Sequence, residues 1–150
     1  MSEITIGKRY TFDAAHRLPL HGGKCSRPHG HTYILEVDFT GLVQTDNCNE
    51  QGMVLDYYKI SEVIKTEIMD RFDHQDLNQV MKPFFNADPE VENCTTAERM
   101  VHIFARLIQR AVDGFGVNVT RVRLQETQNS WAECRPKTVD FGSLRIPGRF

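Results

Sequence analysis

The stretch HGHTYILEVDF, residues 29–39, predicts a β-strand with one buried face. Apolar and polar residues alternate along it, as expected of a strand with one face toward a core and the other toward solvent. The odd positions form the apolar row, which two histidines extend toward the start of the strand: His29, His31, Tyr33, Leu35, Val37 and Phe39. Since alternate side chains share a face, both imidazoles should point the same way as the core residues.

The preceding segment, residues 4–16, has a similar alternation and ends on a third histidine. Its even positions are mostly apolar and read Ile4, Ile6, Lys8, Tyr10, Phe12, Ala14 and His16. A stretch rich in Gly and Pro separates the two predicted strands. An antiparallel pairing across this stretch can bring His16 opposite the other two histidines.

Two helices are predicted after these strands. Asp56 is a candidate N-cap for a helix that runs to about Phe72, with apolar side chains on one face. The sequence TTAE, residues 95–98, has the form of a capping box and predicts a second helix over 97–113. Gly114 and Gly116 are expected to end this helix.

Two further strands complete the predicted domain. Residues 117–126 place Val122, Leu124 and Glu126 on one face, and residues 131–141 form a plausible last strand. The element order is therefore ββααββ. We expect one α+β domain over residues 1–150, with a four-stranded antiparallel sheet covered on one face by two helices.

The bulk composition excludes several classes of protein. The chain has 150 residues and a formal net charge of -2, and its Lys and Arg residues are scattered, so we expect no nucleic-acid partner. It shows neither a signal peptide nor a run of some eighteen apolar residues, which predicts a cytoplasmic protein without a membrane partner. The four cysteines lack C-x-x-C spacing and are expected to be free thiols.

The three histidines predict a metal site. A single histidine is more often an ordinary polar residue, and His21 and His102 receive no role. His16, His29 and His31, however, each extend an apolar row, where burial is costly unless something binds the imidazole. Three neutral imidazoles with a fourth position left for water or substrate are typical of catalytic zinc, so we expect Zn²⁺.

Cys25 and the pair Asp73-His74 are candidates for proton transfer. Cys25 lies four residues before His29, so its sulfur is either a fourth metal ligand or an acid or base near the metal. Asp73 can orient the His74 imidazole as a partner for this thiol. Read alone, the pair is more often a solvated helix end.

Glu126 is a carboxylate that continues an apolar row at the end of a strand. A buried carboxylate fits the donor edge of a 2-aminopyrimidinone, where an amino group and a ring N–H lie side by side. An exposed strand-end glutamate is an equally good interpretation of this position from the residues alone.

Five motifs together resemble those of the 6-pyruvoyltetrahydropterin synthase superfamily over nearly the whole chain. They are FDAAH at 12–16, CSRPHGH at 25–31, DH at 73–74, NCTTAE at 93–98 and QET at 125–127. The short gap between Cys25 and the HGH sequence is similar to that of the 6-carboxy-5,6,7,8-tetrahydropterin synthases of queuosine biosynthesis. The segment 44–53 and the tail 145–150 differ from compact members.

The resemblance implies the tunnelling fold, in which subunit sheets join into a barrel with active sites at subunit interfaces, as a trimer or dimer of trimers. It also implies a pterin triphosphate substrate, 7,8-dihydroneopterin triphosphate, and proton transfer by Cys25, Asp73 and His74. Glu126 would anchor the pterin, together with the backbone of Thr96. We assign Lys24 and Arg27 to the phosphates because they flank Cys25.

Two other functions stay open at this point. A 6-pyruvoyltetrahydropterin synthase would use the same substrate and ligands but keep the three-carbon side chain. A non-catalytic zinc-binding oligomer would keep the histidines for assembly, and the joint presence of Cys25, Asp73, His74 and Glu126 argues against it.

Overall fold

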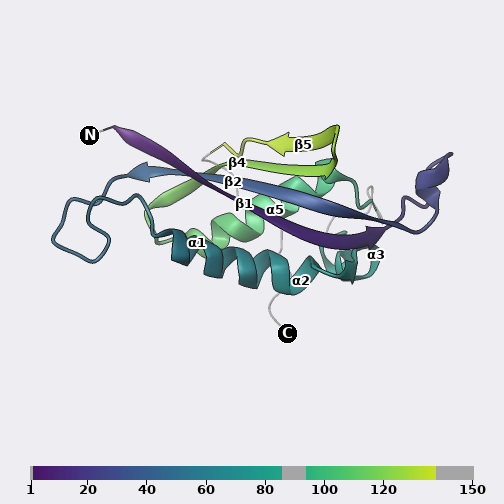
Figure 1. The fold of residues 1–150 in the computed structure, drawn as a ribbon, viewed down its shortest axis with the longest axis horizontal. Coiled ribbons are helices and arrows are strands. Elements are labelled where there is room, and N and C mark those ends of the chain that lie inside the picture. The colour runs from purple at the N-terminus through teal and green to yellow at the C-terminus, as the bar shows by residue number, and fades with distance from the viewer. Residues whose placement is uncertain (1, 86–93, 138–150) are drawn as a thin grey trace.

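A five-stranded sheet forms one layer of the molecule (Figure 1). The computed structural model describes residues 2–85 and 94–137. The strands are β1 (Glu3–His16), β2 (His29–Leu42), β3 (Gln75–Asp76), β4 (Val117–Thr127) and β5 (Ser130–Cys134), in the sheet order β3-β1-β2-β4-β5. The two long strands β1 and β2 pair antiparallel over their whole length.

The helices gather on one face of this sheet (Figure 1). One continuous helical rod consists of α1 (Tyr57–Ile64), a π-helical turn (Lys65–Met69) and α2 (Asp70–Phe72). The other long helix is α5 (Ala97–Val112), and short helices are α3 (Leu77–Val80), α4 (Lys82–Phe85) and a 3-10 turn (Lys24–Ser26). No helix within 2–85 and 94–137 is long and apolar enough to cross a membrane.

The α+β class and the order of the long elements are confirmed, whereas the strand count is not. The sheet has a fifth strand, because the two residues of β3 pair parallel to β1 at Ala14 and Ala15. So short a strand carries no periodic signal in the sequence. The last strand was predicted to reach residue 141 but ends at Cys134, and residues 138–141 lie outside the described part of the chain.

Both predicted helix starts are capped by a side chain, but the second cap is Thr96 and not Thr95, the first residue of the predicted capping box. The Asp56 carboxylate accepts a hydrogen bond from the backbone N–H of Tyr58 (2.8 Å). The Thr96 hydroxyl accepts one from the backbone N–H of Arg99 (3.4 Å). Each cap satisfies a backbone donor that the helix itself leaves free. Gly114, at φ 94°, follows the second helix in the left-handed conformation that glycine adopts without strain.

Strand β4 contains a bulge opposite β2. Asp38 pairs with Arg121 and Phe39 pairs with Val119, so Thr120 has no partner in the ladder. The Thr120 hydroxyl donates to the Asp38 carbonyl oxygen (3.4 Å) and lies 3.0 Å from the hydroxyl of Thr40. The buried row of β4 changes there from odd to even positions: Val117 and Val119, then Val122 and Leu124.

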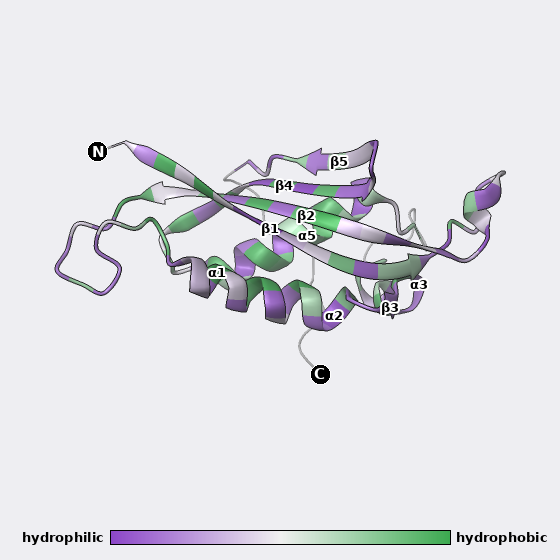
Figure 2. Cartoon of the chain, in the orientation of Figure 1, coloured by the Kyte–Doolittle hydropathy of each residue, from purple (hydrophilic) through white to green (hydrophobic). Residues whose placement is uncertain are grey.

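The core lies between the sheet and the helices. Figure 2 shows apolar and polar residues alternating along β1 and β2, as a sheet with one buried face requires. Phe104 of α5 is fully buried, and its ring centroid is 5.0 Å from that of Phe72 and 6.1 Å from that of Phe12. This aromatic cluster joins both long helices to β1.

Replacing Phe104 by alanine is expected to lower the free energy of unfolding by about 3–5 kcal/mol, because it removes a buried ring and leaves a cavity. Urea denaturation of the purified variant measures this loss. Phe115→Ala is the control, because that ring is 39% exposed and should matter much less. Equal losses in the two variants would contradict the proposed central role of Phe104.

Candidate metal centre and active site

The three histidines meet at the end of the sheet where β1 leads into β2. His16 pairs directly with His29 in the antiparallel ladder, and His31 lies two residues further along β2. Each residue offers one ring nitrogen, and these three atoms lie within 4.8 Å of one another. The separations of the ring centroids are 4.6, 4.9 and 5.1 Å. Strand alternation and antiparallel pairing thus bring the three side chains together, as the sequence pattern predicts.

Backbone carbonyl groups orient two of the imidazoles. His16 Nδ1 lies 3.0 Å from the Thr95 carbonyl oxygen, and His29 Nδ1 lies 2.8 Å from the Arg27 carbonyl oxygen. A carbonyl only accepts hydrogen bonds, so each Nδ1 carries the proton and each Nε2 keeps its lone pair. This is the arrangement that typically fixes metal-binding histidines.

Burial favours the neutral form of these histidines. Desolvation lowers the pKa of His16, which is 3% exposed, and it also lowers the pKa of His31. His16 Nε2 is a buried nitrogen without a hydrogen-bond partner. A buried polar atom of this kind is costly unless something binds it. The three residues therefore fit a metal ion, because neutral imidazoles with available lone pairs are its usual ligands.

Glu126 lies beside the histidine cluster at the end of β4. Its Oε1 atom is 3.4 Å from His16 Nε2 and 3.7 Å from His31 Nε2. Tyr33 is fully buried next to both histidines, with ring centroids 6.2 and 5.5 Å away. Burial and the Glu126 carboxylate together raise the pKa of Tyr33, so its phenol stays neutral. Glu126 is 26% exposed and thus neither fully buried nor free in solvent.

Cys25 lies in the loop that projects beyond this end of the sheet (Figure 1). Its carbonyl oxygen accepts a hydrogen bond from the Leu18 N–H (2.8 Å), which closes the loop on itself. The side chain is partly buried, whereas the neighbouring Lys24 and Arg27 are exposed. Among the described residues, Cys25 is not part of the group of metal-ligating atoms.

Asp73 and His74 form a fixed pair beside β1. Asp73 Oδ1 lies 2.9 Å from His74 Nδ1 and accepts a hydrogen bond from the Asp13 N–H (3.0 Å). The Asp13 N–H is the main reason that the pKa of Asp73 is lowered, and His74 adds to it. His74 has a positive φ of 57° and its N–H donates to the Asp13 carbonyl (2.6 Å). A backbone conformation this uncommon, held by hydrogen bonds, is typical of a functional position.

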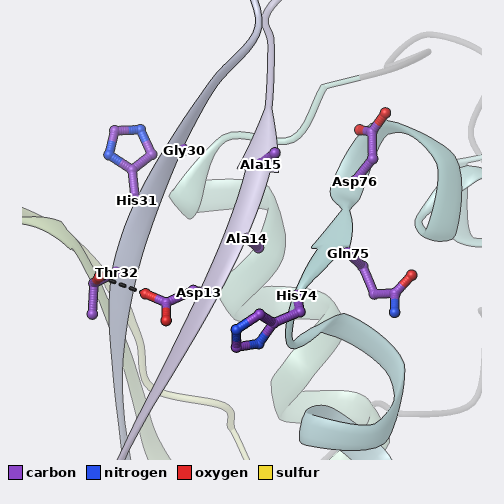
Figure 3. A pocket seen from close by; sticks show the side chains of 9 residues that line it. All are labelled: Asp13, Ala14, Ala15, Gly30, His31, Thr32, His74, Gln75 and Asp76. Atoms are coloured by element: carbon purple, nitrogen blue, oxygen red, sulfur yellow. Dashed lines mark hydrogen bonds between the residues drawn. The ribbon is translucent and has the colours of Figure 1, made fainter.

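A cavity of about 530 Å³ has both His31 and His74 in its lining. Figure 3 shows His31 beside β2 and His74 on the other side of β1, with Thr32 and Asp13 joined by a hydrogen bond across the two strands. Thr32 donates a hydrogen bond to Asp13 (2.5 Å). Gly30 also lines the cavity, where an added Cβ would lie 3.3 Å from the Ala14 carbonyl oxygen. The cavity has room for a small organic molecule.

The predicted site residues thus fall into separate groups. The three histidines and Glu126 lie together, whereas no hydrogen bond joins Cys25 to His74 within residues 2–85 and 94–137. Thr96 caps α5, directly after the residue that orients His16.

Sequence reasoning missed Thr95 and Asn78, which support the histidine cluster. Thr95 is fully buried, and its carbonyl and hydroxyl both face His16 Nδ1. The Asn78 side chain binds the backbone of Arg17 twice, accepting from its N–H (2.8 Å) and donating to its carbonyl (2.9 Å). The two consecutive threonines at 95–96 are only a weak indication in the sequence that Thr95 has a structural role. Nothing in the sequence indicates the role of Asn78, because its partner Arg17 lies 61 positions away.

Asn78→Ala is expected to lower the free energy of unfolding by about 1–3 kcal/mol, because it removes both hydrogen bonds that this side chain makes to the Arg17 backbone. Metal affinity should fall with it, since Arg17 directly follows His16. Urea denaturation and chelator competition measure the two effects. Gln79→Ala is the control, because that side chain is exposed on the same short helix. Unchanged stability in Asn78→Ala would show that water replaces the lost contacts.

Comparison with known proteins identifies the family. The model of the 6-pyruvoyl tetrahydropterin synthase family matches residues 5–137. A Rickettsia felis protein named 6-carboxy-5,6,7,8-tetrahydropterin synthase is 32% identical over 143 residues, covering 87% of this chain and 99% of that protein. An Archaeoglobus fulgidus protein, provisionally given the same name, is 34% identical, covering 89% of this chain and 96% of its own length.

A solved structure shows the same fold. The 6-pyruvoyl tetrahydropterin synthase of Caenorhabditis elegans superimposes with a TM-score of 0.74 at 24% identity, over 91% of this chain and 98% of that one. The family model and the curated relatives confirm the resemblance predicted from the sequence motifs. With the family model matching from β1 to beyond β5, the chain belongs to the 6-pyruvoyl tetrahydropterin synthase family.

Proposed function

We propose that this protein is a zinc-dependent 6-carboxy-5,6,7,8-tetrahydropterin synthase. It would convert 7,8-dihydroneopterin triphosphate to 6-carboxytetrahydropterin, acetaldehyde and triphosphate, in queuosine or 7-deazaguanine biosynthesis. The observation that carries the proposal is the cluster of His16, His29 and His31, whose ligand atoms lie within 4.8 Å of one another. The names of the curated relatives support the choice of reaction.

Zinc is the metal that suits this cluster best. Three histidine ligands with one open position are the usual build of a catalytic zinc site. When bound, zinc would act as a Lewis acid on the hydroxyl groups of the substrate side chain. His16 and His29 are held ready for this by the carbonyl groups that fix their tautomers.

The remaining side chains would bind the substrate and move its protons. Glu126 would accept two hydrogen bonds from the amino group and ring N–H of the pterin, with the backbone of Thr96 beside it. Lys24 and Arg27 are exposed on the projecting loop and would meet the triphosphate.

Cys25 would transfer protons to and from the pterin and its side chain. Asp73 would hold the His74 imidazole in one orientation for the same task, as their 2.9 Å contact supports. Both catalytic roles rest on the residue types and on the family motifs.

A second copy of the chain would complete the active site. The His74 side chain is 75% exposed and has no hydrogen bond to Cys25 within the described residues. β3 pairs only with Ala14 and Ala15 of β1, and Asp73 and His74 bind the backbone of Asp13, which leaves residues 3–12 of that edge open within the described sheet. An open strand edge favours pairing with another chain. We therefore propose a homo-oligomer, a trimer or dimer of trimers, in which His74 faces a neighbouring subunit's site.

Product analysis tests the reaction. The zinc-loaded protein is incubated with 7,8-dihydroneopterin triphosphate, and the products are identified by mass spectrometry. A 6-carboxytetrahydropterin with acetaldehyde supports the proposal. A product that keeps the three-carbon side chain would make the protein a 6-pyruvoyltetrahydropterin synthase. A Dictyostelium discoideum relative that is 27% identical is named 6-pyruvoyl tetrahydrobiopterin synthase. No conversion by a folded zinc protein would exclude both reactions.

A further inference from the structure

The contact between Glu126 and the histidine cluster needs an explanation of its own. The Glu126 Oε1 atom lies 3.4 Å from His16 Nε2 and 3.7 Å from His31 Nε2. The His16 side chain is almost completely buried, at 1% exposure, so water cannot easily separate the two groups. A carboxylate is therefore held against a buried imidazole nitrogen.

These two atoms cannot form a hydrogen bond when His16 is neutral. His16 Nδ1 carries the ring proton, because it faces the Thr95 carbonyl oxygen at 3.0 Å. Nε2 then presents a lone pair to an oxygen that also only accepts. Two acceptors at this distance repel each other unless a cation lies between them.

The separation matches two ligands of one tetrahedral metal ion. Zinc lies about 2.0–2.1 Å from a histidine nitrogen and about 2.0–2.2 Å from a carboxylate oxygen. At the tetrahedral angle, two such ligand atoms are roughly 3.3–3.5 Å apart. The distance from Glu126 to His16 falls in this range, and the distance to His31 is slightly longer.

We propose that Glu126 is a displaceable fourth ligand of the metal in the resting enzyme. The inference rests on the proposed function, because it assumes the metal site that His16, His29 and His31 form. Glu126 is not within the group whose atoms all lie within 4.8 Å, so its side chain would have to rotate to reach a position shared by all three histidines. Its 26% exposure leaves room for that rotation.

This assignment gives Glu126 two successive tasks. In the absence of substrate, the Glu126 carboxylate would hold the metal together with the three histidines and balance part of its charge. With the pterin bound, the same carboxylate would instead accept hydrogen bonds from the donor edge of the ring. One residue would thereby couple recognition of the pterin to opening of the metal site.

The test measures metal binding without substrate. Wild type, Glu126→Gln and the control Glu133→Gln are stripped of metal, and zinc affinity is determined by competition with a chelator. The control removes the same charge on the neighbouring strand β5, where Glu133 pairs with Arg121 and Arg135. Glu126→Gln should bind zinc at least roughly 10- to 100-fold more weakly, the cost known for losing an outer-shell partner. The control should match wild type.

Cobalt supplies a second readout. The visible absorption of the Co²⁺ form reports the ligand set, so Glu126→Gln should change the spectrum while Glu133→Gln leaves it as in wild type. Melting of the metal-free proteins checks that both variants fold.

Two results would overturn the inference, and only the second would also overturn the proposed function. If Glu126→Gln binds zinc as tightly as wild type with an unchanged cobalt spectrum, Glu126 is not a ligand, and the proposed function stands. If wild type itself binds neither zinc nor cobalt, the metal centre and with it the proposed function fall together.

Discussion

Replacing His16 by alanine is expected to abolish both zinc binding and turnover. His16 is the most buried of the three histidines, and its orientation is fixed by Thr95 on the far side of the ring. The loss of zinc affinity should exceed the roughly 10- to 100-fold cost of losing an outer-shell partner, because a direct ligand is removed. Metal content after dialysis, measured by atomic emission, and product formation under saturating substrate check the two effects.

The control for this experiment is His102→Ala. His102 lies on α5 and is exposed, so its removal changes the histidine count without touching the cluster. Because His16→Ala also leaves a buried space, His16→Gln serves as a second variant that keeps a polar side chain of similar length. If both His16 variants retain one zinc per chain, the histidine cluster is not the metal site.

Replacing Cys25 by alanine is expected to give a folded protein that keeps its zinc but turns over roughly 10²- to 10⁴-fold more slowly, which is the usual contribution of a general acid or base. The structure supports this separation, because Cys25 is not part of the metal-ligating group among the described residues. Steady-state kinetics and zinc content, measured on the same preparation, test the expectation.

Cys48→Ala is the matched control for the thiol. Cys48 is exposed in the loop between β2 and α1, far along the chain from the histidine pair. It should keep both zinc and activity. Loss of zinc from Cys25→Ala would instead make Cys25 a ligand, the alternative that its position before His29 leaves open in the sequence.

The parts of the site that the sequence predicts are those that follow from alternation along a strand. His29 and His31 share a face because they are two residues apart, and His16 meets them because the antiparallel ladder pairs it with His29. Helix starts are predicted equally well, since the Asp56 cap acts on a backbone group only two residues away. In each case the deciding contact is local or periodic.

The parts that the sequence does not predict depend on contacts between distant segments. Asn78 binds the backbone of Arg17, and Thr95 orients His16 through its carbonyl group, which any residue possesses. β3 is too short to show a period. The spacing of residues in the sequence also does not determine whether His74 acts with Cys25 of its own chain or of another chain, because this depends on how the subunits assemble.

The bulge at Thr120 determines which side chains in the rest of β4 face the helices. Upstream of it, odd-numbered positions face the helices, whereas downstream the even-numbered positions do. If Thr120 took a regular place in the ladder, every later residue of β4 would turn to the opposite face, and Gln125 would stand where the carboxylate of Glu126 now meets the histidines. A single residue added or removed between 121 and 126 would therefore turn the acidic side chain away from the histidines, unless another change in the ladder restored the register.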